Sequence, residues 1–366
     1  MLSLSNSMRS IWIERTGPPE TLVGHSLHVP EPAEDEVRIR VTAAGVNFAD
    51  LLQRLGLYGH APRRPYVPGF EVAGVVDCVG AQVSHVGSGQ RVAALIPFGG
   101  YAEFAVAPEI SVFPLPHKID LASAAALPVN YLTAWFCLYR LADVRRGESV
   151  LITGGAGGVG TAAVQLARSS GCRVFATVGT DEKVRFVKRL GADFVFNYHR
   201  EDVFTAVKQT ADAMGIDVLL DAVGGWNLRR LSRLVAPLGR IVSYGLASAA
   251  PSTRRLWWTA AWKYFQTPRF HPLQLMERNL GVFGFHLGLL DGRQAEIRSA
   301  FEQILALVAA GRIRPVIDRI FPLTAQGAAA AHRYLHERKN LGKVLLSPLV
   351  NEPTDGSSWR ESGGEE

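Results

Sequence analysis

Runs of hydrophobic residues divide the chain into two parts of different texture. From about residue 9 to 115, β-like runs such as EVRIRVTAAGV and VAGVVDCVG are separated by Gly- and Pro-rich turns, which is typical of a compact, largely antiparallel module. From about 131 to 246, runs such as SVLITGG, RVFATVG and DVLLDAVG alternate with helical segments, which predicts βαβ units and a parallel sheet. The strand-like IRPVIDRIFPL and GKVLLSPL near the C-terminus predict that the chain returns to complete the first module.

We therefore expect an α/β protein with two domains. Residues 1–130 would form the first part of the antiparallel domain, 131–290 a doubly wound parallel-sheet domain, and 291–350 the return to the first domain. Residues 351–366 are polar and rich in Gly and Ser, so we expect this tail to be disordered.

Composition and charge narrow the class of protein. The chain has 366 residues, of which 48% are hydrophobic and 20% charged, so it can bury the core of a soluble two-domain protein. A net charge of +6 favours anionic ligands such as phosphates or an acidic membrane surface. The basic residues are spread along the chain, so we expect no nucleic-acid partner.

The N-terminus and the cysteines point to a cytoplasmic protein. MLSLSNSMRS lacks the apolar region of a signal peptide, and three well-separated cysteines fit a reducing compartment. The uncharged run 121–139 reaches the length of a membrane span, but Pro128 and Asn130 interrupt it. We interpret this run as a core helix that breaks at Pro128.

The strongest motif is a glycine loop between a strand and a helix. The strand at 149–153 runs into G-x-G-x-x-G, a helix follows to about Ser170, and a second strand begins at Arg173. Glycines let backbone N–H groups approach a pyrophosphate, and the helix N-terminus presents further donors to it. This Rossmann arrangement predicts a dinucleotide site that includes Gly155, Gly157, Gly158, Val159 and Gly160.

The second strand of this unit ends without the acid that an NAD site uses. An Asp or Glu at that point would bind the ribose hydroxyls and repel a 2′-phosphate, but the chain continues Gly179, Thr180, and Asp181 begins a helix. Gly179 leaves space, Thr180 offers a hydroxyl, and Lys183 offers a cation, which together suit NADPH. Lys183 could instead be an ordinary exposed helix lysine. Tyr198 could add a phenol to the phosphate pocket or be a surface tyrosine at the sheet edge.

Several segments resemble the zinc-free quinone oxidoreductase branch of the medium-chain dehydrogenase/reductase superfamily. They are AAGVNFADLLQRLGLY, PYVPGFEVAGVV, LPVNYLTAW, ITGGAGGVGTAAVQLA, ATVGTDEKVRFVKRLGAD, FNYHRED and NLGKVLL, and 274–293 looks like the vesicle amine transport protein group. The resemblance implies a GroES-like catalytic domain beside the Rossmann domain. The zinc alcohol dehydrogenases of this superfamily have a cysteine near Asn47, a histidine near Phe70 and a cysteine quartet, so no metal is expected here.

The resemblance also implies the roles of several residues. Asn47 would lie beside the nicotinamide and offer its amide to the substrate oxygen, although an Asn after a strand could simply form a turn. Tyr58 would stand at the pocket mouth, and a proton could come from Tyr58 or from water. Many quinone reductases have a small polar residue near Leu246, so the carboxamide contact there is in doubt. The further residues implied at the cofactor are Asn130, Thr133, Tyr244, Gly245, Leu246, Phe285 and Asn340.

Residues 250–273 form a segment rich in aromatic and basic residues. Trp258, Trp262 and Phe265 fall on one face of a predicted helix. The helix could pack on the core or a partner subunit, lie on a membrane surface, or cover an apolar substrate. The following GVFGFHLG is predicted to be a strand, which in the family pairs across a two-fold axis, so we expect a homodimer in which His286 is structural.

The sequence as a whole predicts an NADPH-dependent, zinc-independent reductase that transfers hydride to a quinone or an α,β-unsaturated carbonyl compound. One alternative is an enoyl reductase that acts on a CoA-linked or carrier-bound thioester. Another is an NADPH-binding, membrane-associated or lipid-handling protein with little turnover, in which the segment 250–273 would make peripheral membrane contact.

Overall fold

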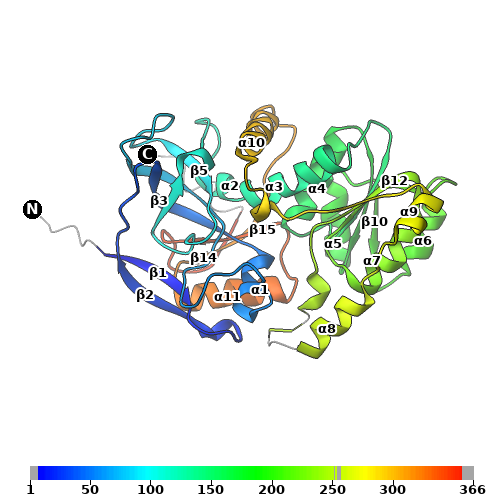
Figure 1. Cartoon of the computed structure of the whole chain (residues 1–366), viewed down its shortest axis with the longest axis horizontal. Helices are drawn as coiled ribbons and strands as arrows, with labels where there is room; N and C mark the ends of the chain where they lie inside the picture. The colour runs from blue at the N-terminus through cyan, green and yellow to red at the C-terminus, as the bar shows by residue number, and fades with distance from the viewer. Residues whose placement is uncertain (1–6, 251, 254–256, 357–366) are drawn as a thin grey trace, which may run out of the picture.

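A six-stranded parallel sheet forms one of the two domains (Figure 1). The computed structural model of the chain describes residues 7–250, 252–253 and 257–356. The strand order is β10-β9-β8-β11-β12-β13, and every pair is parallel. The first strand therefore lies inside the sheet, and the order reverses between β8 and β11, where ligands of doubly wound folds bind. The strands are β8 (Ser149–Thr153), β9 (Arg173–Val178), β10 (Phe194–Asn197), β11 (Ile216–Asp221), β12 (Val235–Ser243) and β13 (Gly281–Gly284).

Helices connect these strands because polar and apolar residues alternate with a helical period between them. The strand, helix and strand predicted around the glycine loop are confirmed as β8, α4 and β9. The helices of this domain are α4 (Gly158–Ser169), α5 (Asp181–Arg189), α6 (Val203–Thr210), α7 (Gly225–Leu231), α8 (Trp257–Gln266) and α9 (Pro272–Arg278).

A second, eight-stranded sheet forms the GroES-like domain and is largely antiparallel, as predicted. Its order is β16-β14-β15-β3-β4-β5-β7, with β6 paired to β3, and only β14 and β15 run parallel. Two of its central strands thus come from the C-terminal part of the chain. The strands are β3 (Glu36–Val46), β4 (Glu71–Val79), β5 (Arg91–Leu95), β6 (Phe104–Pro108), β7 (Val112–Pro114), β14 (Ile317–Pro322), β15 (Lys343–Ser347) and β16 (Thr354–Asp355).

A separate hairpin and two helices cover this sheet. The hairpin consists of β1 (Ser7–Ile13) and β2 (Leu22–His28), and the helices are α1 (Phe48–Leu55) and α11 (Ala325–His336). Asn47 is the N-cap of α1, and its backbone N–H donates to the Asp50 carboxylate at 2.8 Å. The end of β3 and the start of α1 therefore form one fixed turn.

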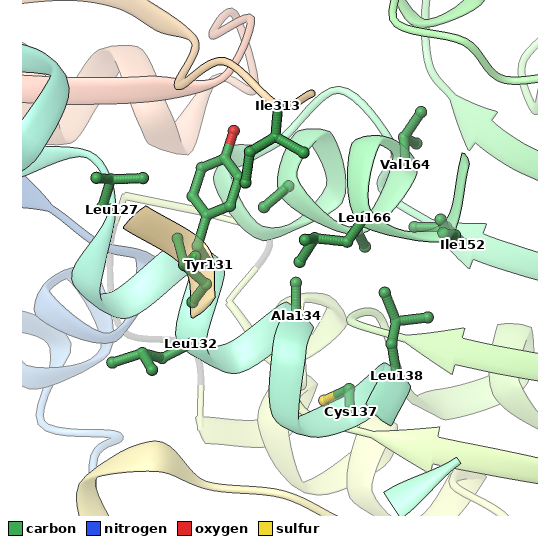
Figure 2. Close-up of a cluster of buried hydrophobic side chains, with 14 of the residues drawn as sticks. Leu127, Tyr131, Leu132, Ala134, Cys137, Leu138, Ile152, Val164, Leu166 and Ile313 are labelled. Carbon is green, nitrogen blue, oxygen red and sulfur yellow. The ribbon is translucent and has the colours of Figure 1, made fainter. Parts of the chain in front are cut away.

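The two domains meet on a buried apolar cluster around α3 (Figure 2). The predicted helix break is confirmed, because α2 (Leu121–Ala125) ends before Pro128 and α3 (Pro128–Trp135) starts with that proline at its first turn. Leu132 and Ala134 on α3 and Val164 and Leu166 on α4 are fully buried. α10 (Gln294–Ala309) also packs against α3, just before the chain returns to the GroES-like domain.

The structure describes the start of the C-terminal tail and the whole of the apolar run 121–139. The expectation that the whole tail 351–366 is disordered is wrong for its first part, because Thr354 and Asp355 pair with β14 and cover its edge. Residues 357–366 lie outside the described residues. Among the described residues, no helix is both long enough and apolar enough to cross a bilayer.

Candidate functional site

The glycine loop meets the C-terminal part of the chain at the N-terminus of α4. Gly157 forms a parallel bridge with Gly342, whose N–H donates to the Ala156 carbonyl at 2.8 Å. The Asn340 amide donates to the Gly342 carbonyl at 2.8 Å. The structure thus brings Asn340, which the family resemblance implied, to the loop that the motif predicted.

Asn130 reaches the same loop from α3. A Cβ atom at Gly158 would lie 2.6 Å from the Asn130 Nδ2 atom, so only glycine leaves room for that side chain. Asn130 and Thr133 are both buried on α3. Asn130 therefore lies next to the dinucleotide loop, and Thr133 lies about one turn further along the same helix.

At the end of β9, the structure gathers the residues predicted for a 2′-phosphate. The Thr180 hydroxyl caps α5 by accepting from the Lys183 N–H at 3.2 Å, and a Cβ at Gly179 would lie 2.6 Å from the Tyr198 hydroxyl. Burial lowers the pKa of Lys183, and its ammonium donates to the Arg338 carbonyl. Lys183 is thus a partly buried lysine with a fixed position, which the exposed-lysine interpretation did not expect.

Asp181, the first acid after β9 in the sequence, is bonded to other partners. Its carboxylate accepts from the Asn197 amide at 2.7 Å and pairs with Arg200 at 2.7 Å. The sequence analysis missed Arg338, which has a left-handed backbone at φ 55° and brings a second cation near Lys183. No local motif indicates that Arg338 lies near Lys183, because the two residues are distant along the chain.

Further residues that the resemblance implied at the cofactor follow β12 and β13, beside the turn after β11. The buried Asp221 accepts from the Gly224 N–H at 2.6 Å and from the Thr153 hydroxyl at 3.1 Å, which fixes the turn after β11. Tyr244, Gly245 and Leu246 follow β12 beside this turn, and the Tyr244 N–H donates to the Asp221 carbonyl at 3.0 Å. Phe285 follows β13 and stacks on Phe136 with ring centroids 5.5 Å apart.

A buried ion pair lies beneath the junction of the domains. The Lys343 ammonium at the start of β15 pairs with the Glu71 carboxylate at the start of β4, and both side chains are almost completely buried. Asn47 bridges them: its Oδ1 accepts from Lys343 at 2.6 Å, and its Nδ2 donates to Glu71 at 2.9 Å. The Val129 N–H of α3 donates to the other Glu71 oxygen at 2.7 Å.

These bonds limit what the Asn47 amide can offer to a substrate. Both polar atoms of its amide are already engaged within the protein, and its remaining contact, from Nδ2 to the Gly45 carbonyl, is long at 3.4 Å. The sequence analysis identified Asn47 but not Lys343, because nothing in NLGKVLL shows that a lysine would be buried.

Asp50 belongs to a neighbouring buried polar chain. The Tyr101 hydroxyl donates to the Asp50 carboxylate at 3.0 Å and lies 3.1 Å from the His332 Nε2 atom. Burial is the main cause that raises the pKa of Asp50 to about 7, and burial lowers the pKa of His332. The Asp50 carboxyl group therefore titrates around neutral pH, where an ordinary aspartate is fully ionised.

Tyr58 lies beside two histidines, His60 from its own domain and His286 from the other domain. Its hydroxyl lies 3.0 Å from the His286 Nε2 atom, and the ring of His60 lies 5.8 Å from that of His286. Burial raises the pKa of Tyr58 to about 12 and, with nearby His60, lowers the pKa of His286. His286 was expected within a strand, but β13 ends at Gly284, so the following loop is free to turn the imidazole toward Tyr58.

The points where related enzymes hold zinc carry no suitable donors. Phe70 is an aromatic side chain that packs on Tyr58 with ring centroids 5.8 Å apart, and the Asn47 amide and Glu71 carboxylate are bonded to Lys343. An aromatic ring and an engaged amide cannot replace thiolate and imidazole ligands, so these residues do not fit a zinc ion.

An antiparallel GroES-like sheet beside a parallel sheet with a dinucleotide loop defines a two-domain dehydrogenase or reductase. Residues 33–117 match the family described as "Alcohol dehydrogenase GroES-like domain", and 158–310 match that described as "Zinc-binding dehydrogenase". The chain belongs to the medium-chain dehydrogenase/reductase superfamily, in the group of the quinone oxidoreductases and the VAT-1 homologues. The resemblance seen in the sequence is thereby confirmed.

Three relatives show how far the similarity extends. The synaptic vesicle membrane protein VAT-1 homolog of Rattus norvegicus is 38% identical over 87% of this chain and 78% of its own. The quinone oxidoreductase of Lama guanicoe is 36% identical over 93% of this chain and 97% of its own. The structure of Escherichia coli quinone oxidoreductase complexed with NADPH matches with a TM-score of 0.83 and 28% identity, and the match covers 93% of this chain and 100% of that chain.

The raised pKa of Asp50 predicts how stability changes with pH. The folded protein holds the proton more tightly than the unfolded chain, so the free energy of unfolding should fall as the pH rises from about 4 to about 7, by roughly 4 kcal/mol. Asp50→Asn should remove this contribution while keeping the acceptor for Asn47 and Tyr101. Urea unfolding of both proteins across this range measures it. Asp291→Asn, at an exposed carboxylate, is the control, and equal pH dependence in all three proteins would contradict the assignment.

Proposed function

We propose that this protein is an NADPH-dependent, zinc-independent reductase that transfers hydride to a quinone or an α,β-unsaturated carbonyl compound. The observation that carries the proposal is the end of β9, where Tyr198 packs on Gly179, the Lys183 ammonium is bonded to the Arg338 carbonyl, and the first acid in sequence, Asp181, is bonded elsewhere. A cation and a phenol at this point suit a 2′-phosphate, whereas an NAD site places an acid there. The NADPH complex of the Escherichia coli relative supports the same choice of cofactor.

The cofactor would lie along the strand ends of the parallel sheet. The glycine loop Gly155–Gly160 and the N-terminus of α4 would bind the pyrophosphate, and Thr180, Lys183, Tyr198 and Arg338 the 2′-phosphate. Asn130, Thr133, Tyr244, Gly245, Leu246, Phe285 and Asn340 would surround the rest. Bound NADPH supplies the hydride.

The acceptor must stabilise the negative charge that it receives, because Asn47 and Phe70 supply no metal ligands. Quinones and conjugated carbonyl compounds do this by delocalising the charge onto oxygen. The second hydrogen of the Asn47 amide, which makes only the long contact to Gly45, could donate to that oxygen. Tyr58, kept protonated by its raised pKa, could then supply a proton.

A membrane-associated role with little turnover is the second candidate. Two observations favour it: Trp258 and Trp262 on α8 are 90% and 63% exposed, and a relative is named as a synaptic vesicle membrane protein. Exposed tryptophans suit a lipid–water interface. Residues 251 and 254–256 of the aromatic segment lie outside the described residues.

A homodimer and a cytoplasmic location remain predictions. Among the described strands, β13 pairs only with β12, so its other edge is available for pairing with a second copy of the chain.

NADPH oxidation over a panel of quinones, enals and enoyl thioesters tests the choice among these functions. We expect turnover with quinones or enals above that with thioesters. Faster turnover of thioesters would support the enoyl reductase alternative. Absence of turnover with every acceptor, together with liposome sedimentation that is lost in Trp258→Ser/Trp262→Ser, would overturn the reductase proposal.

Removal of the Lys183 ammonium tests the cofactor. Lys183→Ala should weaken NADPH binding by about 1–3 kcal/mol because a charge-assisted contact is lost, and it should change NADH binding little. Titration of cofactor fluorescence measures both affinities. Lys188→Ala, at an exposed lysine of the same helix, should change neither, and equal weakening of NADPH and NADH by Lys183→Ala would refute the 2′-phosphate assignment.

The source of the proton can be tested with a matched pair of tyrosines. Tyr58→Phe should lower kcat by about 10²-fold or more if the phenol donates the proton. Tyr66→Phe is the control, because burial raises the pKa of Tyr66 to about 12 as well, but its buried hydroxyl has no hydrogen-bond partner among the described residues. Steady-state rates across pH measure both. A loss below about threefold in Tyr58→Phe would assign the proton to water.

A further inference from the structure

A cavity of about 750 Å³ opens on the nucleotide domain between α7, the end of α8, and α9. Four arginines line it, Arg229, Arg233, Arg269 and Arg278, and the only carboxylate among its lining residues is that of Glu277. The cavity lies outside the predicted cofactor site, which is formed by the glycine loop and the ends of β9 and β12. The proposed reductase function uses none of these arginines.

The walls of this cavity are fixed by bonds within the fold. The Arg278 guanidinium donates to the Ser232 carbonyl at 3.0 Å, and Arg229 lies over the Trp226 ring at 5.9 Å. The Gly225 N–H at the start of α7 donates to the Thr267 hydroxyl at 3.1 Å, which ties α7 to the segment after α8. Two arginines are therefore held in position before any ligand arrives.

The other two arginines bring charge that the fold does not neutralise. Arg233 and Arg269 are exposed and form no ion pair with a carboxylate among the described residues, whereas nearby Arg230 pairs with Asp202. Like charges around one space repel each other, and a bound anion relieves that repulsion. Guanidinium groups match the oxygen geometry of phosphate with paired N–H donors, so a phosphate-bearing group is the ligand that this charge pattern fits.

An apolar cavity of about 490 Å³ lies next to this one, and Phe265 lines both. Its walls come from α1, from α8 and from the segment after β12, and Leu246 is among them. Leu246 is also one of the residues predicted beside the nicotinamide. The aromatic segment thus separates an arginine-lined space from an apolar space that reaches toward the proposed reaction site.

We propose that the arginine cavity binds the phosphate-bearing group of an amphiphilic ligand whose apolar part lies in the cavity lined by Leu246 and Phe265. The placement of this apolar part beside the reacting ring rests on the proposed function, whereas the phosphate site does not. Within that function, the substrate would carry its phosphate as a handle at one end and its apolar reactive part at the other. The phosphate could belong to a soluble molecule or to a lipid headgroup.

Calorimetric titration of the full-length protein with pyrophosphate and with monomeric octyl phosphate tests the site. Arg233→Gln/Arg269→Gln should weaken the binding of both probes at least about tenfold. Arg15→Gln/Arg189→Gln removes the same charge from exposed positions elsewhere and should weaken them less than about twofold. Octyl phosphate should bind at least about tenfold more tightly than inorganic phosphate, and Phe265→Ala should reduce that advantage while leaving pyrophosphate binding unchanged.

NADPH titration of the same variants separates this proposal from the proposed function. Arg233→Gln/Arg269→Gln should bind NADPH like the wild type, and its weaker pyrophosphate binding should persist when saturating NADPH fills the cofactor site. If the wild type binds no NADPH but the arginine dependence remains, the reductase function fails and the phosphate site stands. Equal losses in the two arginine pairs, or displacement of the arginine-dependent pyrophosphate by NADPH, would overturn the phosphate site.

Sedimentation with phosphatidylcholine vesicles, with and without phosphatidic acid, distinguishes the two sources of the phosphate. Arginine-dependent sedimentation with phosphatidic acid indicates a lipid headgroup. Binding of monomeric octyl phosphate without such sedimentation indicates a soluble phosphorylated ligand. No arginine-dependent binding of pyrophosphate, octyl phosphate or vesicles would overturn the proposal.

Discussion

The buried ion pair between Lys343 and Glu71 is the interaction on which the rest of the site depends. Two charges removed from water are tolerated only when their remaining bonding capacity is filled, and here Asn47 and the Val129 N–H fill it. Asn47 lies between β3 and α1, and Val129 lies on α3, so the same contacts that satisfy the charges also fix the GroES-like sheet against the joining helix. Loss of one partner would leave a buried charge unpaired, which is far more costly than loss of a surface pair.

This constraint also explains how the nucleotide loop and the catalytic domain come together. The residues before Lys343 are held in place by the ion pair, and Gly342 then bridges to Gly157 while Asn340 lies beside the loop. The carbonyl of Arg338, a few residues earlier, receives the Lys183 ammonium. One short C-terminal segment therefore contacts the ion pair, the glycine loop and Lys183 of α5, although each belongs to a different part of the chain.

Local signals were sufficient for the residues that act through the backbone. The glycine motif predicted the strand, loop and helix because tight turns and helix starts are set by neighbouring residues, and Pro128 marked a helix break for the same reason. Local signals failed where a side chain meets a partner distant in sequence. Lys343, Arg338 and the contact between Tyr58 and His286 belong to this group. The tail was also misjudged, because a polar segment can still form an edge strand when a neighbouring strand offers its backbone.

The sequence by itself determined the two-domain α/β architecture, the dinucleotide loop, the missing acid after β9 and the lack of zinc ligands at Asn47 and Phe70. Each of these depends on residue type and spacing within a short segment. Only the tertiary structure decided that Lys183 is partly buried, that both polar atoms of Asn47 are engaged, and that four arginines of α7, α9 and the segments beside them surround one cavity. Burial and charge pairing depend on which distant segments pack together, and this information is not local to any stretch of the chain.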